Sequence, residues 1–96
     1  MDAGNQYKQK KLVVLGGGLS GVGAAILAKS KEMDVFLSDS GVLSEQSRSE
    51  LSKYSIPFEE GQHAVEKILE ADEVVKSPGI PYTAPLVMEL IKNNIP

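Results

Sequence analysis

The stretch that decides the fold runs from Lys11 to Gly21 and reads KLVVLGGGLSG. Its first half, Lys11 to Leu15, is a short apolar run stopped by glycines, which is typical of a parallel strand buried on both faces. The residues from Val22 to Lys31 favour a helix, because their alanines are strong helix formers and small enough to lie close to a sheet. Residues 11–31 are therefore predicted to form a strand, a tight glycine turn and a helix in succession.

The glycines of this turn follow the spacing Gly16-x-Gly18-x-x-Gly21. Gly16 allows a tight turn out of the strand, Gly18 lets the backbone approach a phosphate, and Gly21 lets the helix pack closely on the strand. The free N–H groups and the positive dipole end of the helix would then face an anion, and Ser20 adds a hydroxyl. The turn predicts a phosphate site; the simpler interpretation is a glycine-rich turn that binds nothing.

Strands and helices alternate along the rest of the chain. We expect strands at 33–38, 56–60 and 73–76, and helices at 44–54, with Ser44 as its cap, at 64–69 and at 83–93. This rhythm indicates right-handed βαβ units and hence a Rossmann-like, three-layer α/β domain with a parallel sheet, in the expected strand order 3-2-1-4. We expect residues 1–10 to be a polar leader and 11–96 to be the domain, with a fifth strand of a longer protein cut off after Pro96.

Composition narrows the class of protein. The 96 residues suffice for one small domain, and the net charge of −3 argues against a nucleic-acid-binding surface. No apolar run approaches the ~20 residues that cross a bilayer. With no cysteine and a single histidine, His63, the chain has no disulfide and no histidine-based metal cluster, which suits a cytoplasmic protein. His63 itself is expected to be a helix cap or a surface residue.

Asp39 is the second signal, because it ends the second expected strand, where this fold places an acid against a nucleoside. A carboxylate there can accept hydrogen bonds from ribose hydroxyls or from a base N–H. The alternative is an aspartate that only shapes the turn Ser38-Asp39-Ser40-Gly41. Position alone leaves open whether the ligand is a dinucleotide or a single nucleoside diphosphate.

The sequence Ser77-Pro78-Gly79-Ile80-Pro81 after the fourth expected strand favours a single nucleoside diphosphate over a dinucleotide. Together with the glycine turn and Ser38-Asp39-Ser40, it resembles the N-terminal domain of the Mur ligases, and among them the branch that adds D-glutamate. The resemblance covers nearly the whole chain from about Lys10 onward.

The resemblance implies that this domain holds the UDP end of UDP-N-acetylmuramoyl-L-alanine. Gly18, Leu19, Ser20 and Gly21 would cradle the diphosphate and flank the nucleoside. Asp39 and Ser40 would contact the uracil, and Ser77 and Gly79 would close the other side. One departure is Gly41, where members of the family can carry a basic or larger side chain.

The resemblance also implies an ATP-dependent amide ligation in peptidoglycan biosynthesis, with D-glutamate as the amine and Mg²⁺ spreading the phosphate charge. That chemistry needs a G-x-x-x-x-G-K-[ST] loop, which this sequence does not contain. We therefore expect no catalytic residue, metal or cofactor in this chain, and ATP and Mg²⁺ to be bound by further domains of the full-length enzyme.

Two other functions would account for only some of these motifs, or for none of them. An NAD-binding domain of a dehydrogenase or of a redox-sensing regulatory module would use the glycine turn and Asp39, but would leave Ser77-Pro78-Gly79 unexplained. A non-binding interaction domain would leave both the turn and Asp39 unexplained, and no nucleotide should stabilise it.

Overall fold

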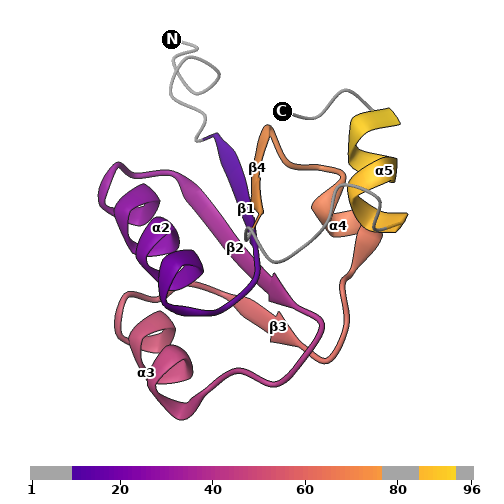
Figure 1. Cartoon of the computed structure of the whole chain (residues 1–96). Coiled ribbons are helices and arrows are strands. Elements are labelled where there is room, and N and C mark those ends of the chain that lie inside the picture. The colour runs from indigo at the N-terminus through magenta and orange to yellow at the C-terminus, as the bar shows by residue number, and fades with distance from the viewer. Residues whose placement is uncertain (1–9, 77–84, 93–96) are drawn as a thin grey trace, which may run out of the picture.

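The computed structural model describes residues 10–76 and 85–92, and these form a parallel sheet between two pairs of helices (Figure 1). Strands pair in the order β3-β2-β1-β4. The elements are β1 (Lys11–Leu15), α2 (Leu19–Ser30), β2 (Asp34–Asp39), α3 (Glu45–Lys53), β3 (Phe58–Glu60), α4 (Val65–Ile68), β4 (Glu73–Lys76) and α5 (Pro85–Lys92). The Rossmann-like α/β class and the strand order 3-2-1-4 expected from the sequence are confirmed.

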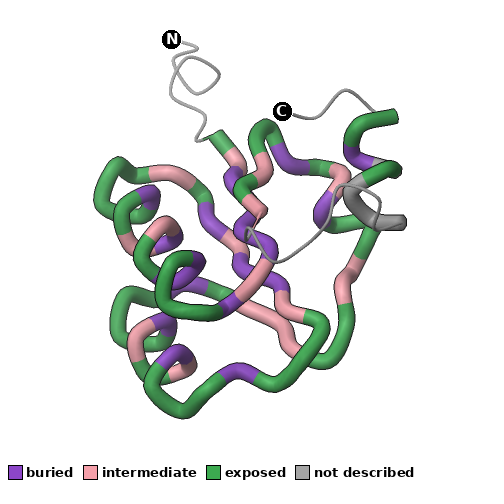
Figure 2. Tube along the Cα trace, in the orientation of Figure 1, coloured by how far each residue is buried: buried purple, intermediate pink, exposed green. Residues whose placement is uncertain are grey.

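The sheet is buried on both faces, because successive side chains of β1 enter two different cores. Leu12 and Val14 pack with α2 and α3, whereas Val13 and Leu15 pack with α4 and α5. Figure 1 shows the two helix pairs on opposite sides of the sheet, and the buried residues in Figure 2 concentrate along the central strands. The apolar run of β1 is thus accounted for by contacts on both sides.

The ends of several elements differ from those expected. Helix α2 begins at Leu19 rather than Val22, because Gly18 already has the extended backbone of a helix cap. Strand β2 begins at Asp34, one position later than expected, and ends at Asp39 as expected, whereas β3 begins only after Pro57. Helix α4 is limited to Val65–Ile68; α5 spans Pro85–Lys92, and the remaining positions of the expected helix 83–93 lie outside the described residues. Helix α3 is slightly shorter than expected, but its predicted cap is confirmed, since Ser44 Oγ accepts from Ser47 N–H at 3.0 Å.

The register brings the polar residues of interest to the carboxyl edge of the sheet. Leu15 pairs with Ser38 of β2, and Asp39 pairs with Glu60 of β3. The glycine turn follows Leu15 directly, so the turn, Asp39 and Glu60 lie at one edge. This is the edge at which open α/β sheets bind ligands.

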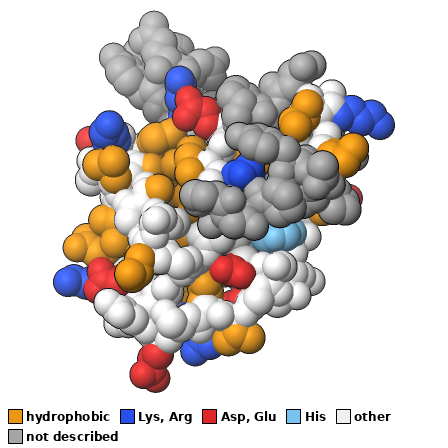
Figure 3. All heavy atoms as spheres, viewed as in Figure 1, with side chains coloured by type: hydrophobic (Ala, Val, Ile, Leu, Met, Phe, Trp, Pro, Cys, Tyr) orange, Lys and Arg blue, Asp and Glu red, His pale blue; other side chains and the backbone are white. Residues whose placement is uncertain are grey.

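No membrane-spanning candidate is found among the helices of the described residues, the longest of which, α2, has 12 residues. On the face seen in Figure 3, acidic and basic side chains are interspersed rather than gathered into a basic patch.

Helix α2 lies against the turn so closely that Gly21 has no room for a side chain. A Cβ at Gly21 would lie 1.9 Å from the carbonyl oxygen of Gly16, whereas a Cβ at Gly23, two positions along the same helix, would meet no atom within 4 Å. The third glycine of the motif therefore serves close packing, as its position predicts.

We expect Gly21→Ala to lower the free energy of unfolding by about 1–3 kcal/mol, since backbone must move to relieve the clash. Gly23→Ala is the matched control, and it should be stabilising by up to about 1 kcal/mol through helix propensity. Urea unfolding of the two variants measures both effects. Equal stability of the two would contradict the close approach of α2 to the turn.

Candidate functional site

The chain leaves β1 through a glycine turn that is hydrogen-bonded to β2. Gly16 has a φ of 108°, in the region that favours glycine, and its N–H donates to Ser38 C=O at 2.9 Å. This hydrogen bond attaches the first residue of the turn to the carboxyl end of β2, beside the end of β1. Gly16 has the conformational role that the motif predicts.

Gly17 is the most tightly enclosed residue of the turn. Its N–H donates to Asp39 Oδ2 at 2.7 Å, and its C=O accepts from Ser47 Oγ of α3 at 2.8 Å. A Cβ on Gly17 would lie 1.9 Å from Leu43 Cδ2. A side chain at Gly17, which is not a glycine of the spacing motif, would therefore have to displace the buried side chain of Leu43.

Gly18, in contrast, faces open space. It caps α2 with φ −74° and ψ −175°, is exposed, and a Cβ there would meet no atom within 4 Å. Among the described residues no side chain caps α2, and its first turn contains no acidic residue. The first N–H groups of the helix, which have no partner inside a helix, are therefore left facing outward at its positive end.

Asp39 uses both carboxylate oxygens on the protein itself. Besides Gly17 N–H, it accepts from Gly41 N–H through Oδ1 at 2.8 Å. The carboxylate thus joins the glycine turn to the loop that follows β2. Each oxygen has a second lone pair, so a ligand N–H or hydroxyl can still be accepted.

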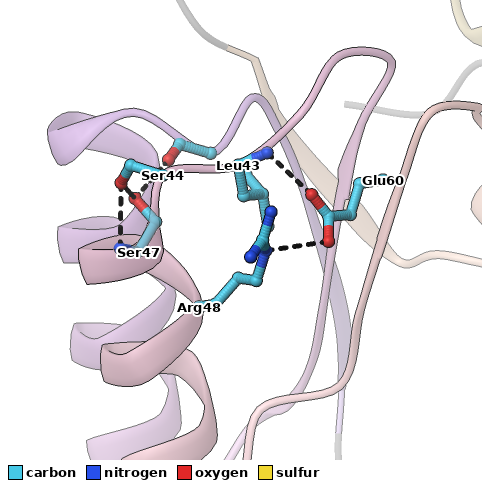
Figure 4. Close-up of polar contacts among 6 residues, drawn as sticks. Leu43, Ser44, Ser47, Arg48 and Glu60 are labelled. Carbon is cyan, nitrogen blue, oxygen red and sulfur yellow. Dashed lines mark hydrogen bonds and ion pairs between the residues drawn. The ribbon is translucent and has the colours of Figure 1, made fainter.

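The loop after β2 is fixed by Glu60 at the end of β3 (Figure 4). Glu60 Oε1 accepts from Leu43 N–H at 2.7 Å, and Oε2 pairs with Arg48 Nε at 3.0 Å. Gly61 N–H also donates to Gly41 C=O at 2.9 Å. These contacts hold the loop as a wall opposite the glycine turn.

Between the turn and this wall lies an open hollow of about 340 Å³. Leu19 and Val42, 80% and 82% exposed, place apolar side chains beside it. The residues that line it are Gly17, Gly18, Leu19, Asp39, Val42, Leu43, Ser44, Gln46 and Ser47. A hollow of this size accommodates a group as large as a nucleoside.

The structure brings together only some of the residues singled out from sequence. Gly18, Leu19 and Asp39 line the hollow, whereas Ser20 and Ser40 are exposed beside it and Gly21 is buried beneath the turn. Ser77 and Gly79 lie outside the described residues. Sequence reasoning missed Gly17, Ser47 and Glu60; the one signal for Ser47 was a polar residue between Leu43 and Leu51 on the apolar stripe of its helix.

A polar cluster lies on the other face of the sheet, below the same edge. Ser38, with no exposed surface, lies 2.7 Å from Glu59 Oε2 and 2.6 Å from His63 Nδ1 through its Oγ. Glu59 Oε2 also accepts from Ala64 N–H at 2.7 Å. His63 is therefore neither the expected helix cap, a position that Ala64 occupies, nor a free surface residue.

The chemistry of this cluster fixes its protons. The Glu59 carboxylate and the more distant Gln62 carbonyl, 3.3 Å from Ser38 Oγ, only accept, so the single proton of Ser38 Oγ is donated toward them. His63 Nδ1 must then carry a hydrogen and donate to Ser38 Oγ, whereas Nε2 takes no part in this bond. The hydrogen-bond chain runs from His63 through Ser38 to Glu59.

Substitutions that mimic one ring nitrogen at a time test whether Nδ1 makes the bond to Ser38. In His63→Asn the amide can take the place of Nδ1 and keep the bond to Ser38, so stability should stay near that of the wild type. In His63→Gln the amide reaches the position of Nε2 instead, and we expect a loss of about 0.5–1.5 kcal/mol, the net value of a hydrogen bond. Urea unfolding compares the two. A Gln variant as stable as the Asn variant would contradict a stabilising bond at Nδ1.

Comparison with known proteins agrees with this arrangement. The MurD N-terminal domain family matches residues 11–85. A UDP-N-acetylmuramoylalanine–D-glutamate ligase of Porphyromonas gingivalis is 51% identical over 84 residues, which are 88% of this chain and 19% of that protein. The ligase of the same name from Bacteroides fragilis is 51% identical over 87 residues, 91% of this chain and 20% of that protein. That of Chlorobium chlorochromatii is 45% identical over 87 residues, 91% and 18%.

The chain thus spans about a fifth of the length of these relatives. The family match covers β1 to β4, and with them the glycine turn, Asp39 and both walls of the hollow. The resemblance drawn from the three sequence motifs is confirmed, and the chain belongs to the MurD N-terminal domain family.

Proposed function

We propose that this chain is the substrate-binding N-terminal domain of a UDP-N-acetylmuramoylalanine–D-glutamate ligase. It holds the UDP end of UDP-N-acetylmuramoyl-L-alanine, and its task is to bind and position that substrate. The name of the relatives supports the choice of substrate, and the open glycine turn supports the place where it binds.

The observation that carries the proposal is the contrast between the glycines of the turn. A Cβ at Gly21 would clash with the backbone of Gly16 and one at Gly17 with the side chain of Leu43, but around Gly18 no atom of the described residues would exclude one. The space beside Gly18 lies at the uncapped start of α2. A diphosphate in that space accounts for the absence of a side chain and receives the N–H groups of Gly18, Leu19 and Ser20.

The hollow beside Gly18 suits the nucleoside. Leu19 and Val42 offer apolar contact to the two faces of a flat ring, and Asp39 and Ser40 supply polar atoms for its edge. Gly41 adds no side chain, so no cation from that position assists binding here. Ser77 and Gly79, which follow β4 in the sequence, are further contacts in this proposal.

In this proposal the ligation takes place in the full-length enzyme, in the cytoplasm, as a step of peptidoglycan biosynthesis. ATP phosphorylates the substrate carboxylate, D-glutamate attacks the acyl phosphate, and Mg²⁺ assists. The ATP-binding loop is a motif that this sequence lacks, so the nucleotide triphosphate and the metal belong to other parts of that enzyme.

An NMR titration of the isotope-labelled chain with UDP, and separately with NADH, tests the proposal. UDP should shift the amide signals of Gly18 to Ser20 and of Asp39, with affinity near the millimolar range, about −4 kcal/mol, because the rest of the substrate contributes no contacts. NADH should produce little change. Binding of NADH with no response to UDP would overturn the proposal.

Gly18→Val is the variant that locates the ligand. Its side chain enters the space assigned to the diphosphate, and its Cβ meets no atom of the described residues within 4 Å, so UDP binding should weaken by more than about tenfold while the fold is retained. Gly23→Ala, on the solvent side of the same helix, should bind UDP as the wild type does. Undiminished UDP binding by Gly18→Val would place the ligand elsewhere.

A further inference from the structure

The peptide groups on either side of Gly17 are each held by a different side chain. The Gly17 N–H bonds to Asp39 at 2.7 Å, and the Gly17 C=O bonds to Ser47 at 2.8 Å. The two side chains come from the end of β2 and from α3, so three elements meet at one residue of the turn.

The direction of the bond from Ser47 follows from its own hydroxyl. A carbonyl oxygen only accepts, so the proton of Ser47 Oγ is donated to Gly17. Ser47 Oγ in turn accepts from Ser44 Oγ at 3.1 Å, and Ser47 is 4% exposed (Figure 4). The hydroxyl is therefore buried, both donates and accepts a hydrogen bond, and points at the turn.

These bonds determine which way the turn presents its donors. In a trans peptide the C=O and the following N–H point in opposite directions, and none of the described peptide bonds is cis. Asp39 fixes the Gly16–Gly17 peptide, which directs the Gly16 C=O toward Gly21. Ser47 fixes the Gly17–Gly18 peptide, which directs the Gly18 N–H away from α3.

We propose that Ser47 is a positioning residue for the nucleotide, because it fixes the peptide that presents the Gly18 N–H to the diphosphate. The inference rests on the proposed function for its ligand. Without Ser47 the peptide between two glycines is free to rotate, since glycine tolerates the backbone angles of either orientation. In the rotated form the Gly17 carbonyl oxygen would face the phosphate and repel it.

The test compares Ser47→Ala with Ser49→Ala, the same change at an exposed position of α3. Ser47→Ala should raise the UDP dissociation constant about tenfold, the value of one oriented hydrogen bond to a phosphate. Ser49→Ala should leave it unchanged. Ser47→Thr, which keeps the hydroxyl, should recover most of the affinity. Equal affinity of Ser47→Ala and wild type would overturn the inference.

A second readout needs no ligand. In the free Ser47→Ala chain the amide signals of Gly17 and Gly18 should shift or broaden, while the amide of Leu51, in the core beneath the same helix, keeps its hydrogen-exchange protection. Unchanged signals of Gly17 and Gly18 would overturn the role of Ser47, as would an equal loss of protection at Leu51, which would indicate general loosening of α3. If the wild type does not bind UDP, the proposed function fails, but these amide data still decide whether Ser47 holds the turn.

Discussion

The hydrogen bond from Gly17 N–H to Asp39 is the contact on which the carboxyl edge of the sheet depends. It joins the residue after β1 to the last residue of β2, and through the second carboxylate oxygen to Gly41 in the next loop. The distance of 2.7 Å is that of a short bond to a charged acceptor. Because Asp39 connects both sides of the hollow, its position sets the width of the space between them.

This arrangement also bears on which nucleotide the edge suits. In a pyridine-dinucleotide domain the acid at the end of the second strand accepts from ribose hydroxyls. Here both oxygens of Asp39 already accept backbone N–H groups, so a ribose would have to share them. The second lone pair of each oxygen could serve a ribose hydroxyl or a base N–H alike, so the preference for a nucleoside diphosphate in the proposed function rests on the family match over residues 11–85.

The sequence was sufficient to predict the order of the elements, because apolar runs and glycine spacing are local signals. Strand β1, the strand order and the cap at Ser44 were predicted correctly. The start of α2 was placed late, because the glycines and Ser20 were assigned to the turn although Leu19 already begins the helix. Boundaries of this kind depend on backbone angles that glycine leaves open.

The candidate site was harder to predict, because its supporting contacts join residues far apart in the chain. Ser47 reaches Gly17 from α3, and His63 reaches Ser38 across the edge of the sheet. Neither spacing follows from a motif. The sequence did contain one clue, since Ser47 interrupts the apolar stripe between Leu43 and Leu51, and a polar residue that points into a core needs a partner there.

The most direct test of this account is a crystal structure of the chain with UDP bound. The account predicts the diphosphate within hydrogen-bonding distance of the amides of Gly18, Leu19 and Ser20, with the Gly17 carbonyl still bonded to Ser47 and the uracil in the hollow beside Asp39. A diphosphate bound away from the turn, or a Gly17–Gly18 peptide that has rotated to meet it, would contradict the account.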